Sequence, residues 1–536
     1  MSGKNLKSLL IAISLVLFCL PASLAQTKRE LIKLEIGAKD NFENKRFKES
    51  KAMYTILDSL KPGNALFIYP LIVSSIAVND YESLLPFVEK GFKVKDQMPS
   101  DFLLYAAKAY HLNYKFDEAE QYYLEYKKHA LNARKPDPVL ISTLNRDIKM
   151  CQNARELVAN PLDIQIKNMG SSINSPYADY GPVISADEST IIFTSNRPNS
   201  TTVFLTDEEY EYLDDIYISH KTDTGWSEPH NMGPNINSKN HDAGIALSAD
   251  GQKLLIYRSE KTKIMSFPTG DIYISELQGD AWSKAEKLPA DINTKNWEPS
   301  ASFSSDERTL YFTSNRKGGI GGTDIYSVKK LPTGEWAVPQ NLGDKINTPF
   351  DEDSPFMHPD GKTLYFSSNG HKSMGGYDIF YSQFNAETNE WSEPKNVGYP
   401  INTPSDDIYF SWSADGTTAY FSSYRKDSYG DVDIYYANVF QETSPVLLMK
   451  GFVIDSISQA PVQATIKVTD KNTNELVGIF NSNSSTGKFI IILNNGSYNV
   501  SIQSENYEFC VDDLDLTDLT EYREIDRNIK LCPKKE

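Results

Sequence analysis

Residues 305–328 read SDERTLYFTSNRKGGIGGTDIYSV, and the parts of this stretch recur in the same order along the middle of the chain. An Asp-centred turn opens the stretch, a β-rich run follows, and a glycine-rich link leads to the strand signature Asp-Ile-Tyr. The Asp-centred turns are Asp187, Asp250-Gly251, Asp306, Asp360-Gly361 and Asp415-Gly416. The strand signatures are Asp215-Ile216-Tyr217, Asp271-Ile272-Tyr273, Asp324-Ile325-Tyr326, Asp378-Ile379-Phe380 and Asp433-Ile434-Tyr435.

Two further sequence markers recur with the same period as this repeat. The dipeptide Ile-Asn recurs at Ile173-Asn174, Ile236-Asn237, Ile292-Asn293, Ile346-Asn347 and Ile401-Asn402. A tryptophan closes each of four units, at Trp226, Trp282, Trp336 and Trp391. Each unit offers four short strands with turn residues between them, which is what one blade of a β-propeller requires. We therefore predict a five-bladed propeller over residues 162–442.

The ends of this region are expected to meet. The fifth unit stops at Val439-Phe440 and lacks the closing tryptophan, whereas 164–170 (IQIKNMG) matches 339–343 (PQNLG) from the middle of the repeat. The first strand, near 164–167, would complete the last blade and hide both edges of the ring.

The flanking regions differ from the repeat. Residues 28–160 place apolar side chains at helical spacing. The clearest pair, 103–110 and 117–123, sets small alanines against large aromatics, and its period of about 34 residues resembles the tetratricopeptide repeat. An ordinary helical bundle is the alternative. Residues 446–532 alternate short strands with Gly and Asn turns, which predicts a small β-sandwich. The overall prediction is a multidomain chain, α followed by all-β.

The N-terminus is expected to be a cleaved secretory signal over residues 1–25. An apolar run at 9–20 follows two lysines, is too short to span a bilayer, and ends in small residues up to Ala25. A lipid-anchored precursor at Cys19 is the alternative, and Phe18 stands where such precursors carry a small residue. No later segment approaches 18 consecutive apolar residues, so we expect no transmembrane segment.

Charge and motifs exclude several classes of function. The net charge of −18 repels phosphates, so binding to nucleic acid is not expected. Histidine and cysteine spacings fit no metal site, and no nucleophile elbow occurs. The run Gly318–Gly322 lacks the Gly-Lys-Ser/Thr of a phosphate loop. We therefore expect no enzyme, metal or cofactor. Cys510 and Cys532 lie in one small module and are able to pair in an oxidising compartment.

One candidate binding site follows from the repeat itself. Five residues after each Ile-Asn asparagine stands a carboxylate, and these are Asp179, Asp242, Glu298, Glu352 and Asp407. Equivalent positions lie at equal radius in a propeller, so the five would ring one mouth of the central channel and bind a basic loop, a peptide amine or a metal ion. Alternatively each carboxylate holds backbone N–H groups or an arginine such as Arg197, Arg316 or Arg425, and serves the fold.

The units 306–343 and 360–398 resemble the WD40-like, TolB-type (PD40) propeller repeat, and 446–532 is similar to a carboxypeptidase-regulatory-like domain. With tetratricopeptide-like helices before them, behind a signal peptide, they resemble the PorE-like, OmpA-family periplasmic proteins of Bacteroidetes. Members usually continue into an OmpA-like domain that holds peptidoglycan. This sequence ends at Glu536 without one, so that activity is not implied.

The resemblance implies a scaffold in the periplasm or at the outer membrane, serving type IX secretion or envelope assembly. Its expected partners are envelope or secretion-system proteins, bound by the helical groove and by propeller loops, among them the acidic insert 201–213. Binding of glycan or peptidoglycan is the alternative. A propeller-containing hydrolase is less favoured, because no segment of suitable length is left for a catalytic domain.

Overall fold

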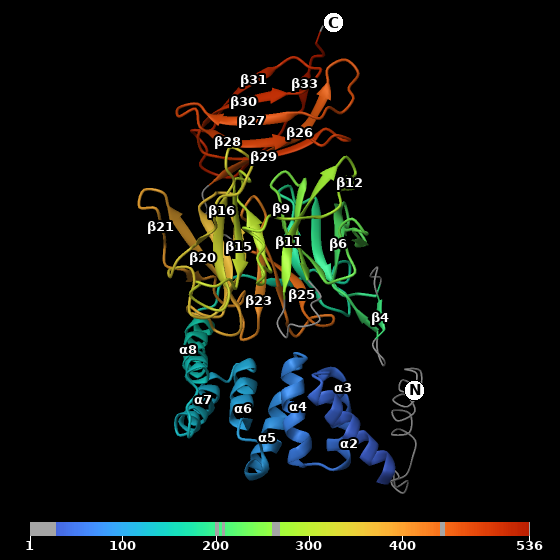
Figure 1. The fold of residues 1–536 in the computed structure, drawn as a ribbon, viewed down its shortest axis with the longest axis vertical. Helices are drawn as coiled ribbons and strands as arrows, with labels where there is room; N and C mark the ends of the chain where they lie inside the picture. Colours follow the sequence, from blue (N-terminus) through green and yellow to red (C-terminus); the bar gives the residue numbers. More distant parts are fainter. Residues whose placement is uncertain (1–27, 199–202, 206–209, 260–268, 440–444, 535–536) are drawn as a thin grey trace. The chain divides into compact units, whose positions relative to one another are not determined.

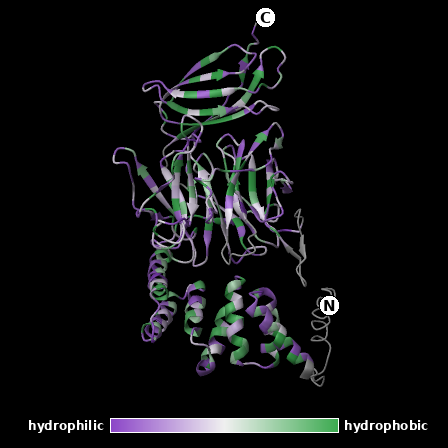
Figure 2. Cartoon of the chain, viewed as in Figure 1, coloured by the Kyte–Doolittle hydropathy of each residue, from purple (hydrophilic) through white to green (hydrophobic). Residues whose placement is uncertain are grey.

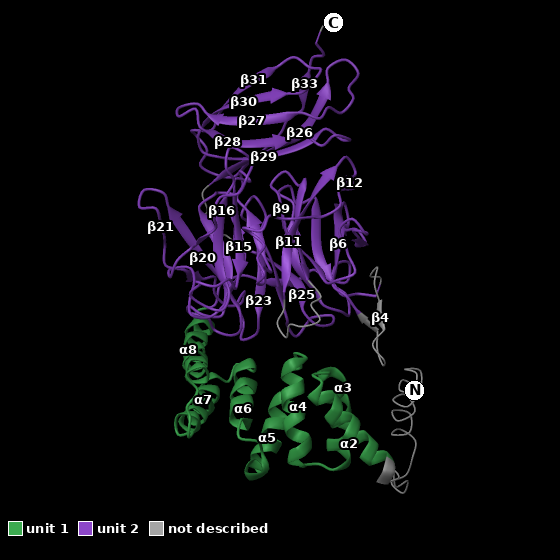
Figure 3. Cartoon of the chain, viewed as in Figure 1, with its two compact units in different colours: residues 1–160, 203–211 green, residues 161–202, 212–536 purple. Residues whose placement is uncertain are grey.

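The computed structural model describes residues 28–198, 203–205, 210–259, 269–439 and 445–534 (Figure 1). The chain divides into two compact units, Met1–Asn160 with Val203–Glu211, and Pro161–Thr202 with Tyr212–Glu536 (Figure 3). The described α-helices belong to the first unit, and a large β region fills the second, as the sequence predicts. The predicted signal at 1–25 and the acidic residues 206–209 of the insert lie outside the described residues.

The helical unit begins its elements with recognisable caps. The Asn64 side chain accepts a hydrogen bond from Leu66 N–H at the start of α4, and Asp137 caps α8 just before Pro138. Among the described residues, no helix has the length and apolar character needed to cross a membrane. The helices are α2 (Lys28–Glu43), α3 (Phe47–Leu60), α4 (Ala65–Ala77), α5 (Leu84–Lys93), the 3₁₀ turn η1 (Lys95–Gln97), α6 (Phe102–Leu112), α7 (Phe116–Leu131) and α8 (Pro138–Ala159).

Small residues let these helices approach one another. A Cβ on Gly91 of α5 would stand 2.6 Å from the Phe102 ring of α6, so only glycine fits there. Ala106 and Ala109 of α6 are fully buried beside this contact. On α7, Tyr122 stacks on Tyr110 with ring centroids 5.4 Å apart. The α6–α7 contact shown here is aromatic on aromatic, and the pairing of small alanines with large aromatics between 103–110 and 117–123 stays a prediction.

Residues 166–438 form five antiparallel sheets, which we number 1 to 5 and together call the five-sheet region. Sheet 1 contains β2 (Asp179–Ile184), β3 (Thr190–Ser195), β6 (Asp215–Thr222), β7 (Gly225–Trp226) and β8 (His230–Asn231). Sheet 2 contains β9 (Asp242–Leu247), β10 (Lys253–Ser259), β11 (Gly270–Gln278), β12 (Ala281–Trp282) and β13 (Glu286–Lys287). Sheet 3 contains β14 (Ala301–Phe303), β15 (Thr309–Ser314), β16 (Asp324–Lys329) and β17 (Gln340–Asn341).

Sheet 4 contains β18 (Glu352–Met357), β19 (Thr363–Ser368), β20 (Asp378–Asn385), β21 (Glu390–Trp391) and β22 (Lys395–Asn396). Sheet 5 contains β23 (Asp407–Trp412), β24 (Thr418–Ser423), β25 (Asp433–Asn438) and β1 (Ile166–Asn168). A separate pair, β4 (Val203–Leu205) and β5 (Tyr210–Tyr212), lies in the insert. The order of strands in each sheet thus repeats the order of the sequence markers.

The Asp-centred turns join the first and second strands of each sheet. In sheet 5 the Asp415 carboxylate accepts hydrogen bonds from Ser413 Oγ at 2.5 Å and from Thr417 N–H at 2.9 Å. Asp306 accepts the same two kinds of bond in sheet 3, from Ser304 and Arg308. A short side chain that satisfies the turn's own backbone favours reversal of the chain there.

The first strands of the five sheets contact one another in a closed cycle. Strand β2 contacts both β9 and β23, β14 contacts both β9 and β18, and β18 contacts β23. Strand β1, from the start of the region, pairs antiparallel with β25, and Lys167 lies opposite Tyr436. The prediction that the stretch near 164–167 completes the last sheet is thereby confirmed. Pairing of the two ends protects strand edges that would otherwise be exposed.

The Ile-Asn dipeptides join each sheet to the one before it. The Asn347 side chain accepts a hydrogen bond from Ile325 N–H at 2.7 Å and donates one to the carbonyl of Ile325 at 3.0 Å. Its amide also donates to Asn341 Oδ1 at 2.9 Å. The same two backbone bonds recur between Asn174 and Ile434, Asn237 and Ile216, Asn293 and Ile272, and Asn402 and Ile379.

Residues 446–531 form the C-terminal β region, in which two sheets share one core. The core takes Leu447 and Phe489 from one sheet and Ile466 and Val500 from the other. One sheet contains β26 (Val446–Asp455), β29 (Lys488–Asn494), β32 (Arg523–Asp526) and β33 (Ile529–Leu531). The other contains β27 (Thr465–Asp470), β28 (Leu476–Asn481), β30 (Ser497–Gln503) and β31 (Cys510–Asp515). Cys510 and Cys532 are free thiols here, so the pairing that the sequence allows is not formed.

Strand β29 is apolar from Phe489 to Leu493, between a polar residue at each end (Figure 2), because both faces of this stretch are buried. Phe489 and Ile491 point into the core of the C-terminal β region. Ile490 and Ile492 pack with Ala414 of the five-sheet region instead. An uninterrupted apolar strand is what burial on two sides requires.

Polar contacts at the Asp turns strengthen this docking. Lys488 Nζ lies 2.6 Å from the Asp187 carboxylate. Asn494 donates a hydrogen bond to the carbonyl of Asp360, and Asn483 donates one to the carbonyl of Gly279. Burial alone would raise the pKa of Asp187, but the hydrogen bond and charge of Lys488 lower it to about 2. The C-terminal β region is therefore held at the Asp-turn end of the five-sheet region.

Candidate functional site

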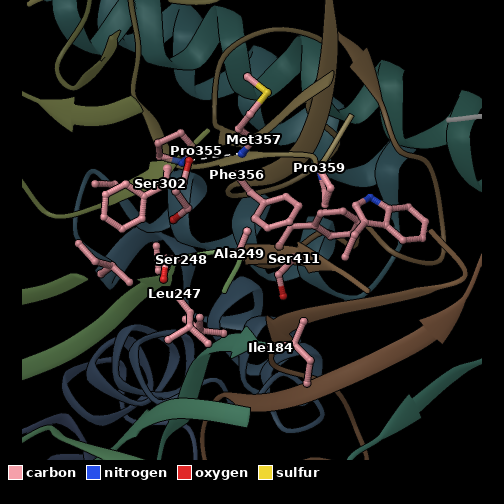
Figure 4. Close-up of a pocket in the computed structure, with 18 of the residues that line it drawn as sticks. Ile184, Leu247, Ser248, Ala249, Ser302, Pro355, Phe356, Met357, Pro359 and Ser411 are labelled. Atoms are coloured by element: carbon pink, nitrogen blue, oxygen red, sulfur yellow. Dashed lines mark hydrogen bonds between the residues drawn. The ribbon is translucent and has the colours of Figure 1, made fainter. Parts of the chain in front are cut away.

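The first strands of the five sheets line a cavity of about 100 Å³ (Figure 4). Its wall is largely apolar, and includes Ile184 of β2, Leu247 of β9 and Phe356 of β18. Ile492 of β29 also lines it, so the C-terminal β region contributes to the wall. The cavity is the feature of the five-sheet region that all five repeats build together.

Hydroxyl groups in the wall bind neighbouring strands and turns. Ser302 Oγ accepts a hydrogen bond from Met357 N–H at 3.3 Å (Figure 4), and Ser411 Oγ donates to the carbonyl of Pro182 at 3.1 Å. Ser248 Oγ donates to the Asp250 carboxylate at 2.6 Å. In none of these three contacts does a serine meet a histidine, so they contain no nucleophile paired with a base.

The five carboxylates predicted to ring a channel mouth occupy equivalent places near the start of the first strands. None lines the cavity, and each is fully buried; the five are Asp179, Asp242, Glu298, Glu352 and Asp407. Each accepts hydrogen bonds from the N–H and the hydroxyl of a Ser or Thr four residues earlier. For Asp179 the donors are Ser175 N–H at 2.5 Å and Ser175 Oγ at 2.6 Å. These contacts hold the preceding loop, as in the structural alternative, and ligand binding by the five carboxylates stays a prediction.

In four of the sheets an arginine also binds the carboxylate. Arg197 Nη2 lies 2.5 Å from Asp179 and donates to the carbonyl of Ile173 at 2.6 Å, while its guanidinium stacks over Phe193. We call the carboxylate, its Ser or Thr and its arginine the carboxylate clamp. The other ion pairs are Arg258 with Asp242, Arg316 with Glu298, and Arg425 with Asp407. Because the arginine also binds the Ile-Asn loop, the clamp fixes the loop that joins two sheets.

Sheet 4 departs from this pattern. His371 replaces the arginine, and its Nε2 lies 2.8 Å from the carbonyl of Ile346. Glu352 is left with three neutral donors at 2.7 Å, Thr348 N–H, Thr348 Oγ1 and Ser368 Oγ. Burial raises the pKa of Glu352 to about 7, and its hydrogen bonds from Thr348 and Ser368 offset this only in part. Burial also raises the pKa of Asp407 to about 6, even beside Arg425, and it lowers the pKa of His371.

The Glu352 carboxyl should therefore make stability fall as pH rises. Its pKa in the folded state, about 7, exceeds the unfolded value of 4.5, so the native state loses stability between these two pH values. We expect Glu352→Gln, which does not titrate, to gain about 2–3 kcal/mol relative to wild type from pH 4.5 to pH 8. His371→Arg should reduce this dependence and not abolish it, because burial still raises the pKa of Asp407 to about 6 beside Arg425.

Urea unfolding of wild type and both variants at several pH values measures this effect. Any titration of His371 is common to wild type and Glu352→Gln, and so cancels from their difference. The exposed Glu387→Gln serves as the control and should follow wild type at every pH. A Glu352→Gln difference that does not change with pH would contradict the interpretation.

The sequence found three of the clamp arginines and missed two partners. Arg258 lies within β10 itself, directly before Ser259, and not in the Ser-Asn-Arg pattern that follows β3 and β15. His371 is displaced by Gly370, which is inserted after the Ser-Asn of sheet 4. A search for any basic residue within three positions of the second strand's end would have found both.

The described residues offer little of the chemistry that catalysis uses. Among them, no group of three or more His, Cys, Asp or Glu side chains is placed to hold a metal ion. Cys151 is buried beside His111, with Sγ 3.6 Å from Nδ1. Burial, and then the charges of Glu120 and Asp147, raise the pKa of the Cys151 thiol to about 12, so it stays protonated and is a poor nucleophile.

No family model and no curated protein matches this chain. Among solved structures, levansucrase of Bacillus subtilis is 9% identical, with 55% of this chain and 92% of that chain covered and a TM-score of 0.35. The tricorn protease is 10% identical over 48% of this chain, with a TM-score of 0.30, and hydroxyquinol 1,2-dioxygenase from Pseudomonas putida DLL-E4 is 14% identical over 18%, with a TM-score of 0.14. This chain covers 26% and 64% of those two chains. At such TM-scores the likenesses support no functional argument.

Proposed function

We propose that this protein is a non-enzymatic scaffold of the cell envelope that binds protein partners. In this proposal the helices of residues 28–160 are tetratricopeptide-like repeats, the five-sheet region is a five-bladed β-propeller of the WD40-like, TolB type, and the C-terminal β region is a carboxypeptidase-regulatory-like sandwich. The chain would belong with PorE-like, OmpA-family proteins in the periplasm or at the outer membrane, and serve type IX secretion or envelope assembly.

The observation that carries the proposal is that the five repeated carboxylates bond to groups of the fold itself. All five are fully buried, and their side-chain hydrogen bonds are to groups of their own sheet and its leading loop. Buried and bonded in this way, they are not free to act as general acids, bases or metal ligands. The loops between strands differ from one repeated unit to the next. Variable loops on a rigid frame suit recognition of another protein.

Photocrosslinking in intact cells of the source organism tests this proposal. A photoreactive phenylalanine analogue at Leu66 of α4, which is 75% exposed, or at Tyr429, which is 50% exposed, should give discrete protein adducts. The same analogue at Val338, also 75% exposed but on the outer strand side of sheet 3, serves as the control. Adducts no stronger than those from Val338, together with labelling by a serine-hydrolase probe or chelator-sensitive hydrolysis, would overturn the proposal.

Glycan or peptidoglycan binding is the second candidate, because aromatic rings and carboxylates gather near the start of the first strands. The Tyr180 and Tyr409 rings lie 5.6 Å apart, and Asp353 and Tyr409 belong to adjacent first strands. Retention of the purified protein on washed sacculi, with loss of retention in Tyr180→Ala, would favour this function over the protein scaffold.

A further inference from the structure

The cavity has two chemically different ends. Each first strand begins beside its clamp carboxylate and ends at an Asp turn. At the Asp turns the C-terminal β region is docked, through Lys488 on Asp187 and Asn494 on Asp360. The starts of the first strands therefore lie at the opposite end, which we call the mouth.

The mouth carries two carboxylates that lack a basic partner. Asp353 accepts hydrogen bonds from Ser300 Oγ and, at 2.6 Å, from Ser354 N–H. Asp406 accepts one from Tyr377 N–H at 2.8 Å. In the part of the chain that the structure describes, no ion pair joins either of them to a Lys, Arg or His, in contrast to the arginine-bound carboxylates of the clamps.

Two tyrosine rings lie at the mouth, one from β2 and one from β23. Tyr409 lines the cavity, and its ring centroid lies 5.6 Å from that of Tyr180. Burial, followed by the charges of Asp353 and Asp214, raises the pKa of Tyr409, so the phenol stays neutral. Burial also raises the pKa of Asp353, so a cation beside this carboxylate would favour its charged form. Aromatic faces beside carboxylates attract ammonium and guanidinium groups.

Ser354 adds an unsatisfied polar group at the same place. It is 7% exposed and lines the cavity, and its Oγ has no hydrogen-bond partner. Its backbone has a φ of +53°, where β18 carries a bulge, and Tyr409 has a φ of +56° at the bulge of β23. A buried hydroxyl without a partner is uncommon in a folded protein, and a bound ligand is one way to satisfy it.

We propose that the mouth receives a basic segment of a partner protein, in which an apolar side chain enters the cavity and an adjacent Lys or Arg is held by Asp353 and the Tyr409 ring. The proposal rests on the scaffold function and names the chemistry of the partner.

Size and charge agree with this occupant. The cavity of about 100 Å³ is smaller than the engineered 150 Å³ cavity that holds benzene, and suits one aliphatic side chain. A cation set directly into the apolar wall would lose its hydration, whereas Asp353 offers a carboxylate beside Ser300 and Ser354, which line the cavity. The chain's net charge of −18 also favours approach of a basic segment.

Binding of four capped dipeptides to the full chain tests the proposal. We expect acetyl-Leu-Lys-amide to bind with a Kd of roughly 0.1–1 mM, within the usual limits of ligand efficiency. Acetyl-Leu-Gln-amide, acetyl-Leu-Glu-amide and acetyl-Gly-Lys-amide should each bind at least tenfold more weakly, because each lacks the cation or the apolar group. Isothermal titration at low and high salt measures the four affinities, and the Lys peptide should weaken with salt.

Variants of the mouth separate binding from folding. Asp353→Asn keeps an oxygen for Ser300 and Ser354 and should reduce the Leu-Lys over Leu-Gln preference to twofold or less. Asp406→Asn provides a second test if Asp353→Asn fails to fold, and Glu475→Gln, exposed on the C-terminal β region, should behave as wild type.

Different results of these experiments would refute the basic-segment proposal and the scaffold function. Equal binding of the four peptides, an unchanged preference in Asp353→Asn, or binding of a chitin oligosaccharide in their place would overturn the basic-segment proposal, even if crosslinks form at Tyr429. Cleavage of the peptides, seen by mass spectrometry, would instead refute the non-enzymatic scaffold.

Discussion

Replacing Arg197 by methionine is expected to lower the free energy of unfolding of the five-sheet region by about 3–5 kcal/mol. Methionine keeps part of the packing over Phe193 but removes the guanidinium from Asp179, which is fully buried. The carboxylate would keep the two donors of Ser175 and lose its ion pair with Arg197. A buried charge left without its partner is far more costly than a broken ion pair at the surface.

Scanning calorimetry and urea unfolding measure this loss. Lys317→Met is the control, because it removes one positive charge from the same region, at an exposed position that forms no ion pair within the described part of the chain. We expect that variant to stay within about 0.5 kcal/mol of wild type. An Arg197→Met protein as stable as Lys317→Met would show that the clamp does not hold the sheet.

Asn347→Leu is expected to cost about 2–4 kcal/mol. Leucine is close to asparagine in size but makes none of the bonds that Asn347 makes to Ile325 and Asn341. The carbonyl of Ile325 retains a bond from Leu342 N–H, so the main penalty is the buried N–H of Ile325, which would be unpaired.

Thermal unfolding with a probe in sheets 3 and 4 measures this effect. Asn472→Leu, at an exposed turn of the C-terminal β region, is the matched control and should change stability little. Hydrogen exchange should show earlier opening at Ile325 in Asn347→Leu than in wild type. Unaltered protection of Ile325 would mean that the Ile-Asn loop does not join the two sheets.

The five-sheet region could be predicted because the residues that form its turns and links recur in each of the five units. Every sheet requires a tight turn after its first strand and a link to the preceding sheet. Asp306 stabilises the turn of sheet 3, and Asn347 links sheet 4 to sheet 3. The closing strand could be found in the same way, since 164–170 repeats a motif that the fifth unit lacks.

The roles of single side chains could not be read from that pattern. Spacing places Asp179 and its four counterparts at equal radius, but it does not say whether their side chains face the cavity or the Ser and Thr of the preceding loop. The structure shows the second arrangement. The burial of Asp179 depends on the reach of Arg197, which is a matter of packing and not of spacing.

The residues of the mouth escaped prediction because they are not repeated. Asp353 has Tyr180, Ala243, Pro299 and Ile408 at the equivalent positions, so no repeated signal marks it. Tyr409 is placed by a bulge in β23 and a left-handed backbone, which a tyrosine rarely adopts. Only the structure brings these two residues together beside one cavity.

A double-mutant cycle on Asp179 and Arg197 tests most directly whether the repeated carboxylates serve the fold. With Asp179→Leu, Arg197→Met and the double variant, urea unfolding should show the double variant at least 2 kcal/mol more stable than the sum of the single losses predicts. All folded variants should keep the crosslinks formed at Tyr429. Additive losses, or crosslinks abolished by Asp179→Leu in a protein as stable as wild type, would place Asp179 in partner binding and contradict its structural role.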